Sequence, residues 1–377
     1  MAACRLFCSP CWSWLSGGES ELKALKLVLL SSVLSSAVWA GPKDVLHIYN
    51  WSGSLSDAIL RQFEKSCDCR VVQNYYGDNE EMLAKLAAGA KGYDMVFPSS
   101  FVIEAMSKQK LLQPLDHAKL PNLKNVDPAY LSQSYDPGNR YTVPTVLSLT
   151  SVGYNAERLQ KLGIDPHSWS VIFDPKVLQK IKGKVTVLDS SREVFAAALF
   201  YLGKNPNTAS QADYRAAQAV IKQAKPYWAT FSNASYLKEL AVGNIWVSLG
   251  YSTEFFQAAE DARLAKRRFH IANVAQKEGN ELGVDTMAVL ASAKRPDLAH
   301  QFINFMLDGK NAAQLTNLNG ATNPVKTAAP FFRADLKAHP VIDPTPDTVK
   351  KWTVLRELTP VERRSLARMW TEVKVSR

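Results

Sequence analysis

Short apolar runs alternate with segments of helical periodicity along most of this chain, and this alternation limits its fold more than any other feature. In the first series, apolar residues form compact runs that are separated by stretches in which they recur every three or four positions. Such a series predicts a mostly parallel sheet with helices on both faces. The predicted strands are 45–49, 70–75 and 93–97, and the predicted helices are 55–66, 80–90 and 101–108.

A second series of the same kind follows, and a long extended segment separates the two. Residues 141–155 are rich in β-branched side chains, and we expect them to cross from one lobe to another. The sequence therefore predicts an α/β protein with two lobes. The later predicted strands are 184–189, 228–231, 245–249, 269–275 and 284–292, and the later predicted helices are 193–202, 211–224, 235–242, 253–266 and 296–307.

The composition is that of an ordinary globular protein. The chain has 377 residues, enough for about two domains, with 46% hydrophobic and 21% charged residues. These values exclude a disordered chain, a collagen-like fibre and a coiled coil. The formal net charge is +10, but the basic residues are scattered apart from short clusters such as 266–268. We interpret them as a solvated surface and expect no nucleic-acid partner.

The first forty residues have the pattern of a secretory signal. Lys23 and Lys26 precede an apolar run of small residues that ends in Val38, Trp39 and Ala40. This pattern predicts a signal peptide over residues 1–40, cleaved after Ala40, and export to the periplasm. The alternative is an uncleaved anchor helix. Residues 1–21 contain three cysteines and two glutamates, which is unusual for a signal, so we interpret them as a start assigned too early.

Two cysteines lie beyond this signal, Cys67 and Cys69, on either side of Asp68. A disulfide and two free thiols are both compatible with an exported chain. A redox function is not expected, because catalytic pairs normally have two intervening residues at a helix start.

Catalytic motifs are missing from the sequence. None of the six histidines stands in an H-E-x-x-H or other metal-binding spacing, and neither a G-x-S-x-G elbow nor a P-loop occurs. We therefore expect neither an enzyme nor a cofactor. In α/β sheets, ligands bind beyond the carboxyl ends of strands, so the cleft between two lobes is the expected site. The loops expected to line it are 50–54, 97–101, 189–193 and 250–254, with 283–286 entering a strand.

Six short sequence segments along the chain resemble those of the periplasmic spermidine- and putrescine-binding proteins of bacterial ABC importers. The resemblance is collinear from about residue 43 to 377 and implies a type II periplasmic binding protein fold, in which two lobes joined by two crossings close over a ligand. It implies lobe one as 43–145 plus 267–321, and lobe two as 146–266 plus 322–377. The segments are LHIYNWS at 46–52, GYDMVFPSS at 92–100, LQPLD at 112–116, VGYN at 152–155, REVFAAALFYLGKNPN at 192–207 and MWTEVK at 369–374.

The resemblance also implies a set of ligand-binding residues. Aromatic faces cover the methylene chain of a polyamine, and carboxylates bind its ammonium groups. Tyr251 stands where the family usually has Trp, and Glu254 where a putrescine binder has Asp. The residues that match family positions are Trp51, Ser52, Ser99, Glu193, Tyr251, Glu254 and Asp285.

Three of these residues can also be judged without the resemblance. Asp285 lies within an apolar strand pattern, where an acid needs a partner or a ligand. Trp51 follows a strand and precedes a turn-like Ser-Gly pair, a context typical of a site. Glu193 could instead simply favour a helix N-terminus, where negative charge is stabilised.

Other family positions lack their aromatic residues. Ser54, Gly283 and Ala321 stand where the family has aromatic side chains, and residues 145–147, directly after Pro144 in the crossing, are Thr, Val and Leu where the family often has aromatic residues. We therefore expect a wider cleft that takes a different or bulkier amine.

The predicted function is that of a monomeric, non-catalytic receptor. We expect it to capture a polyamine or related amine and deliver it to an inner-membrane ABC permease. The alternative is a ligand-responsive sensor or interaction protein on the same scaffold that binds a non-polyamine small molecule.

Overall fold

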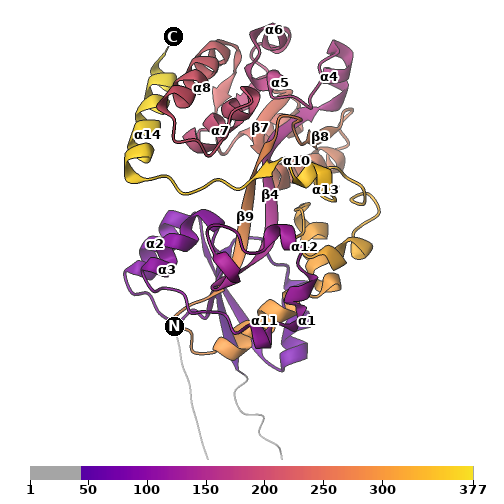
Figure 1. Ribbon diagram of the computed structural model, residues 1–377. Coiled ribbons are helices and arrows are strands. Elements are labelled where there is room, and N and C mark those ends of the chain that lie inside the picture. Colours follow the sequence, from indigo (N-terminus) through magenta and orange to yellow (C-terminus); the bar gives the residue numbers. More distant parts are fainter. Residues whose placement is uncertain (1–43, 377) are drawn as a thin grey trace, which may run out of the picture. The chain divides into compact units, whose positions relative to one another are not determined.

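Two long antiparallel strands, β4 (Thr142–Asn155) and β9 (Asn280–Val289), connect the two halves of the fold (Figure 1). The computed structural model describes residues 44–376. The strands pair from Thr142 opposite Ala288 to Thr150 opposite Glu281, with one irregularity between Pro144 and Val146. The β-branched segment predicted to cross between lobes is therefore a single strand, and β9 is the second crossing.

The lower half in Figure 1 is built from the first predicted series. Strand β1 pairs in parallel with β2 and β3, as the alternation predicts, and β3 pairs antiparallel with β9. Along β1, Ile48 faces the helices α1 and α11, whereas Tyr49 faces α2 and α3. The elements of this half are β1 (Val45–Trp51), α1 (Asp57–Cys67), β2 (Arg70–Tyr76), α2 (Asn79–Ala87), β3 (Met95–Val96), α3 (Ile103–Lys108), α11 (Pro296–Met306) and α12 (Gly309–Asn319).

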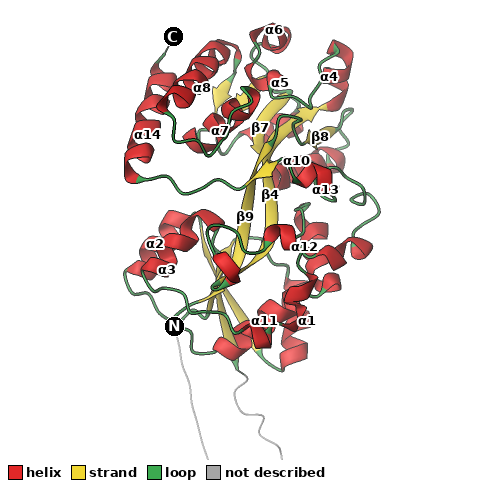
Figure 2. Ribbon diagram, in the orientation of Figure 1, coloured by secondary structure: helices red, strands yellow, loops and turns green. Residues whose placement is uncertain are grey.

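The upper half is built from the second series, and helices again cover its sheet (Figure 2). Strand β5 pairs in parallel with β6 and β7, while β4 pairs antiparallel with β7 and β8. The strands here are β5 (Val185–Val187), β6 (Thr230–Phe231), β7 (Val247–Tyr251) and β8 (Ile271–Val274). The helices are α4 (Ala156–Leu162), α5 (Ser170–Phe173), α6 (Pro175–Leu178), α7 (Ser191–Tyr201), α8 (Gln211–Ala224), α9 (Tyr236–Val242), α10 (Ser252–Leu264) and α14 (Pro360–Val375). Two short elements, α13 (Pro346–Val349) and β10 (Trp352–Thr353), precede α14.

The structure corrects two details of the predicted sheet. The sheet is mixed rather than mostly parallel, because β4 and β9 cross between the halves and run against their neighbours. The strand predicted over 284–292 begins earlier, at Asn280, because Asn280 pairs with Trp352 of β10 and the residues from Glu281 onward pair with β4. Asn280, Glu281 and Gly283 have low β propensity, so tertiary pairing decides their conformation.

Each half has its own hydrophobic core. The upper core joins Val152 of β4 to Leu366 of α14, and the lower core joins Ile48 of β1 to Phe302 of α11. Residues from Val325 to Ile342 also pack in the lower core, which differs from the return to lobe two expected at residue 322. Ile271 of β8 packs in the upper core, whereas lobe one was expected to resume at 267. The exact lobe boundaries stay a prediction.

Three other expectations concern export and the cysteines. Cys67 and Cys69 form a disulfide in the structure, one of the two states left open by the sequence. Within residues 44–376, no helix has both the length and the apolar character needed to cross a membrane. The predicted signal peptide lies outside the described residues.

The packing of α10 against β4 generates a stability prediction. A Cβ added at Gly153 would lie 2.2 Å from the ring of Phe255, which is buried in the upper core. Because a buried ring has little room to move, we expect Gly153→Ala to lower the free energy of unfolding by about 1–3 kcal/mol. Denaturant-induced unfolding followed by circular dichroism measures this change.

Gly77→Ala is the matched control, because a Cβ there meets only the carboxylate end of Glu81 at 3.3 Å. Equal unfolding free energies for the two variants would contradict the close approach of α10 to β4.

Candidate functional site

A group of hydrogen-bonded polar side chains lies where β3 ends against β9. The Ser99 hydroxyl donates to Asp285 Oδ1 over 2.6 Å. Asn79, at the start of α2, donates from its side-chain amide to Ser99 Oγ and accepts from the Ser99 amide, both over 3.1 Å. Thr286 extends the contact, since its backbone N–H donates to the carbonyl of Pro98 over 2.9 Å. Two predicted site residues, Ser99 and Asp285, are thus brought together.

Two aromatic rings stand beside this group and fix the same backbone carbonyl. The Trp51 indole N–H donates to the Phe97 oxygen over 2.9 Å, and the Tyr76 hydroxyl donates to it over 2.6 Å. The two rings meet edge to face, with centroids 4.5 Å apart. The charge of Asp285 is close enough to Tyr76 that it helps burial to raise the pKa of this phenol. Trp51 therefore also has a packing role, because its ring contacts Tyr76. Tyr76 was not among the site residues predicted from the sequence.

The upper half contributes a second polar group. The Tyr251 hydroxyl donates to Glu193 Oε1 over 3.1 Å, and the Ser190 hydroxyl donates to Glu193 Oε2. Tyr251 ends β7 and Glu193 lies in the first turn of α7, so both follow strands of the upper sheet. Burial and the charges of Glu193 and Glu281 raise the pKa of the Tyr251 phenol. The structure therefore joins two further predicted site residues.

Glu281 belongs to this second group and was not predicted from the sequence. Thr150 of β4 stands opposite Tyr251 on one side and opposite Glu281 on the other, so the three form one row across the sheet. The Thr150 hydroxyl donates to Glu281 Oε2 over 3.1 Å. The sequence did contain a signal for Glu281, since its spacing of four residues from Asp285 places both acids on one face of a strand. This signal was missed because the predicted strand began at residue 284, after Glu281.

The other predicted residues have no direct contact with these groups among the residues described. Ser52 is exposed in the turn after β1. Glu254 lies in the first turn of α10, three residues after Tyr251, and its Oε2 atom is buried without a hydrogen-bond partner in the part of the chain that the structure describes. Gly283 lies between the two acids of β9, so nothing protrudes between them.

The four acids lack cationic partners within residues 44–376. Glu193, Glu254, Glu281 and Asp285 form no ion pair there with Lys, Arg or His, and the bonds to three of them come from hydroxyl groups. Burial raises the pKa of Asp285 to about 6, although its bond from Ser99 opposes the change. Burial also raises the pKa of Glu254 to about 7. Burial, with the charge of Glu193, raises the pKa of Glu281 to about 8. Each of these three carboxyl groups is therefore harder to ionise than in water, and a bound cation would favour its ionised form.

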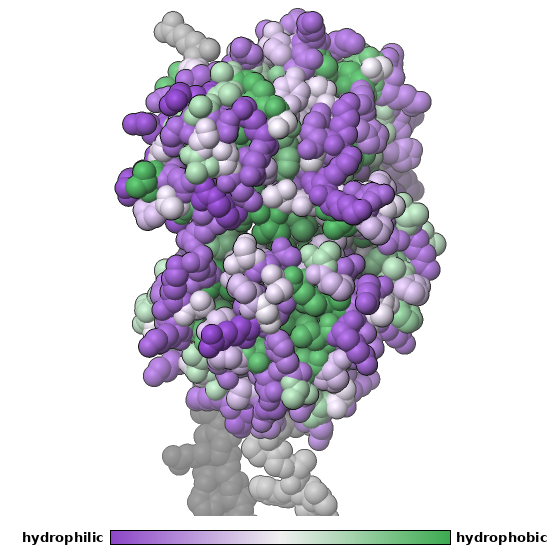
Figure 3. Space-filling view, viewed as in Figure 1, coloured by the Kyte–Doolittle hydropathy of each residue, from purple (hydrophilic) through white to green (hydrophobic). Residues whose placement is uncertain are grey.

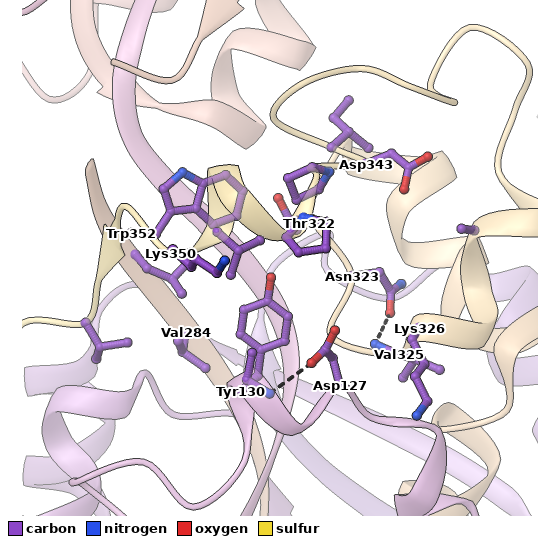
Figure 4. Close-up of a pocket in the computed structure, with 18 of the residues that line it drawn as sticks. Asp127, Tyr130, Val284, Thr322, Asn323, Val325, Lys326, Asp343, Lys350 and Trp352 are labelled. Atoms are coloured by element: carbon purple, nitrogen blue, oxygen red, sulfur yellow. Dashed lines mark hydrogen bonds between the residues drawn. The ribbon is translucent and has the colours of Figure 1, made fainter. Parts of the chain in front are cut away.

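A cavity of about 530 Å³ lies on the opposite face of β9 from these acids. Leu282 and Val284 line it, whereas the alternating residues Glu281, Gly283 and Asp285 point the other way. Figure 4 shows Tyr130, Thr322 and Trp352 around this cavity. Its charged residues are of both signs, whereas Glu281 and Asp285, on the other face of β9, have no cationic partner within residues 44–376. The charged residues of the cavity are Asp127, Asp343, Lys326 and Lys350.

Comparison with known proteins agrees with this architecture. Residues 58–343 match the model of the bacterial extracellular solute-binding protein family. A putrescine/cadaverine-binding protein of Pseudomonas aeruginosa is 44% identical over 350 residues, which cover 93% of this chain and 99% of the relative. The putrescine-binding periplasmic protein PotF of Escherichia coli is 34% identical and covers 90% of this chain and 94% of its own.

Solved structures with the same fold come from other bacteria. The spermidine/putrescine substrate-binding protein PotD of Streptococcus pneumoniae superposes with a TM-score of 0.81 at 24% identity and covers 89% of this chain and 99% of its own. The TpPotD lipoprotein of Treponema pallidum gives 0.75 at 26% identity and covers 88% and 99%. The predicted two-lobed binding-protein fold and the family resemblance are confirmed.

The buried carboxyl of Glu254 generates a prediction about pH. Its pKa is raised to about 7 in the folded protein, so the unfolded chain releases this proton at lower pH than the folded one. Folding stability contributed by this group therefore falls as pH rises from about 4.5 to 7. Glu254→Gln removes this pH-dependent loss. We therefore expect the difference in unfolding free energy, variant minus ligand-free wild type, to be larger at pH 8 than at pH 5 by about 1 kcal/mol or more.

Denaturant titrations of both proteins at the two pH values measure this difference. The contributions of the other titrating groups cancel, because both proteins contain them. A difference that does not change between pH 5 and pH 8 would contradict the assignment. Glu80→Gln, on the exposed surface of α2, is the matched control and should show no such change.

Proposed function

This chain belongs to the family of bacterial extracellular solute-binding proteins, and we propose that it binds a polyamine between its two lobes. The observation that supports the ligand class is the set of four acids without cationic partners within residues 44–376. Buried carboxylates are costly unless they are paired, so a site built from them favours a cationic ligand. Their bonds to hydroxyl groups orient the carboxylates without neutralising them.

The arrangement of the acids favours a cation with separated charges. Asp285 belongs to the lower half of the site, and Glu193 to the upper half. Ammonium groups held by these acids would be joined by an apolar chain, which Trp51, Tyr76 and Tyr251 can cover. A polyamine has this chemistry.

The relatives agree with this ligand class. The names of the similar proteins from Pseudomonas aeruginosa and Escherichia coli include putrescine and, for one of them, cadaverine. We propose the predicted set as the ligand-binding residues of this chain, with Asp285 and Glu193 as the principal acids. The full set is Trp51, Ser52, Ser99, Glu193, Tyr251, Glu254 and Asp285.

The crossing strands support a hinge. β4 and β9 join the halves, and the irregularity between Pro144 and Val146 is a local weakness in their pairing. Figure 3 shows apolar side chains gathered in the recessed band between the halves. We propose that rotation about β4 and β9 closes the lobes over the ligand and covers part of this apolar surface.

The cellular role follows from the family. The family consists of binding proteins rather than enzymes, and we propose that this chain has no catalytic activity. We further propose that a cleavable signal directs it to the periplasm, where it delivers its ligand as a monomer to an inner-membrane ABC permease. We propose no nucleic-acid partner.

Thermal denaturation tests the ligand class. The purified protein without residues 1–40 is heated with putrescine, cadaverine, spermidine, and with glycine and glucose as ligands of other chemistry. A ligand at one hundred times its dissociation constant adds about 2.7 kcal/mol to stability, so we expect a clear rise in melting temperature with at least one polyamine. A rise with glycine or glucose and none with the polyamines would contradict the proposal.

Calorimetric titration of Asp285→Asn tests the site. The carboxylate accepts from Ser99 and would hold one ammonium group, so its loss leaves a buried cation unpaired. We expect polyamine binding to weaken by about 2–5 kcal/mol, or roughly 30- to 5,000-fold. Asp57→Asn, on the exposed surface of α1, is the control. Wild-type affinity in the Asp285 variant would place the ligand elsewhere.

A further inference from the structure

Glu281 is an acid in the site that the proposed set of ligand-binding residues does not include. It lies on the same face of β9 as Asp285 and is only partly exposed. Thr150 holds its carboxylate in place by donating to Oε2 over 3.1 Å. A side chain oriented in this way is available for a ligand, because its second carboxylate oxygen accepts no hydrogen bond within residues 44–376.

The carboxyl group of Glu193 lies close to that of Glu281. Glu193 lies close enough that its charge opposes ionisation of Glu281. The charge of Arg192 acts the other way, but its guanidinium donates to Tyr214 Oη over 3.2 Å and to the Arg356 carbonyl over 3.0 Å. Two neighbouring carboxylates without a cation between them are costly, and an ammonium group that bridges them removes this cost.

No side chain of β9 lies between Glu281 and Asp285 on their face of the strand. Gly283 is the residue of β9 on the same face between the two acids. It stands opposite Ser148, whose Oγ would lie 2.9 Å from an added Cβ. Because glycine has no side chain, an extended ligand can lie close to the backbone here. A methylene chain could therefore run along β9 from one acid to the other.

The spacing of the two acids suits a short diamine. Four residues of an extended strand span about 13 Å, and side chains stand roughly perpendicular to a sheet, so the carboxyl groups of Glu281 and Asp285 are separated by a similar distance. An extended chain of single bonds advances about 1.2 Å per bond, so the nitrogens of a diamine with four or five methylene groups are about 6–7 Å apart. Ammonium–carboxylate contacts of about 2.8 Å at both ends bring the total to about 12–13 Å. A triamine with nine bonds between its terminal nitrogens needs about 16 Å by the same reckoning.

We propose that Glu281, together with Glu193, forms a second ammonium-binding subsite opposite Asp285 and Ser99, and that the position of Glu281 fixes the distance between the two charges that the ligand must have. This inference rests on the proposed polyamine-binding function and adds one residue to its site. Glu281 acts as a specificity-determining residue, since it fixes where the second charge of the ligand must lie. Tyr251, which bonds to Glu193, covers the methylene chain at this end.

Calorimetric titration with a ligand series tests the proposal. The series contains α,ω-diamines with three to six methylene groups, spermidine, and n-butylamine, which has one charge. We expect the wild-type protein to bind the four- and five-methylene diamines at least a hundredfold more tightly than n-butylamine. In Glu281→Gln, we expect these diamines to bind at least tenfold more weakly and the preference for length to flatten. n-Butylamine should change less than twofold, because it binds at Asp285.

Two further variants separate binding from folding. Glu281→Asp withdraws the carboxylate by one bond, so we expect the preferred diamine to become one methylene group longer. Glu80→Gln, on exposed α2, should leave all affinities unchanged. The melting temperature of each ligand-free variant verifies that it is folded.

Proton release gives an independent readout. Glu281 is largely protonated at pH 7 because burial and Glu193 raise its pKa to about 8, and a bound ammonium favours its ionised form. Arg192 and Tyr251 are the other titratable groups nearby. We expect diamine binding at pH 7 to release protons, seen as a dependence of the binding enthalpy on the buffer, and to release fewer in Glu281→Gln.

The outcomes separate this inference from the proposed function. If the wild-type protein binds no amine, the proposed function fails. If it binds diamines and Glu281→Gln retains the same affinities and length preference, only the second subsite is overturned. An equal loss for diamines and n-butylamine would also overturn it, because the effect would then not depend on the second charge.

Discussion

The antiparallel pairing of β4 with β9 is the interaction on which the rest of this structure depends. It joins the two halves, and its register decides which side chains face the site. With Thr150 opposite Glu281, the residues Glu281, Gly283 and Asp285 lie on one face of β9, and Leu282 and Val284 lie on the other. A shift of the register by one residue would exchange these faces and place both acids in the cavity that Leu282 and Val284 line.

The acids make the ligand-free site an unfavourable arrangement that the rest of the fold must support. The pKa values of Asp285, Glu254 and Glu281 are all raised, so each carboxyl is harder to ionise here than in water. The hydrophobic cores of the two halves provide stability that offsets this cost. A cationic ligand would offset the cost of ionising these buried carboxyl groups, and this gain would contribute to its binding free energy.

The two faces of β9 differ in the side chains that surround them. The cavity behind it contains acids and lysines together and has no excess of one charge. The site face has carboxylates and hydroxyls, with Trp51, Tyr76 and Tyr251 at its two ends. In the proposed function, one strand would serve both closure and recognition, because β9 connects the halves and carries Glu281 and Asp285. A ligand that contacts both ends of the proposed site would then favour closure.

The sequence by itself determined the α/β series, the crossing strand over residues 141–155 and the family, and it singled out Ser99, Asp285, Tyr251 and Glu193 as candidates, which the structure then joined in two pairs. Local periodicity, together with sequence segments shared along the whole chain, was sufficient for these predictions. Only the tertiary structure decided where β9 begins, that residues 325–342 pack in the lower core, and that Glu281 joins the site. Glu281 and Gly283 have no local preference for a strand, and their conformation comes from pairing with β4, more than a hundred residues away.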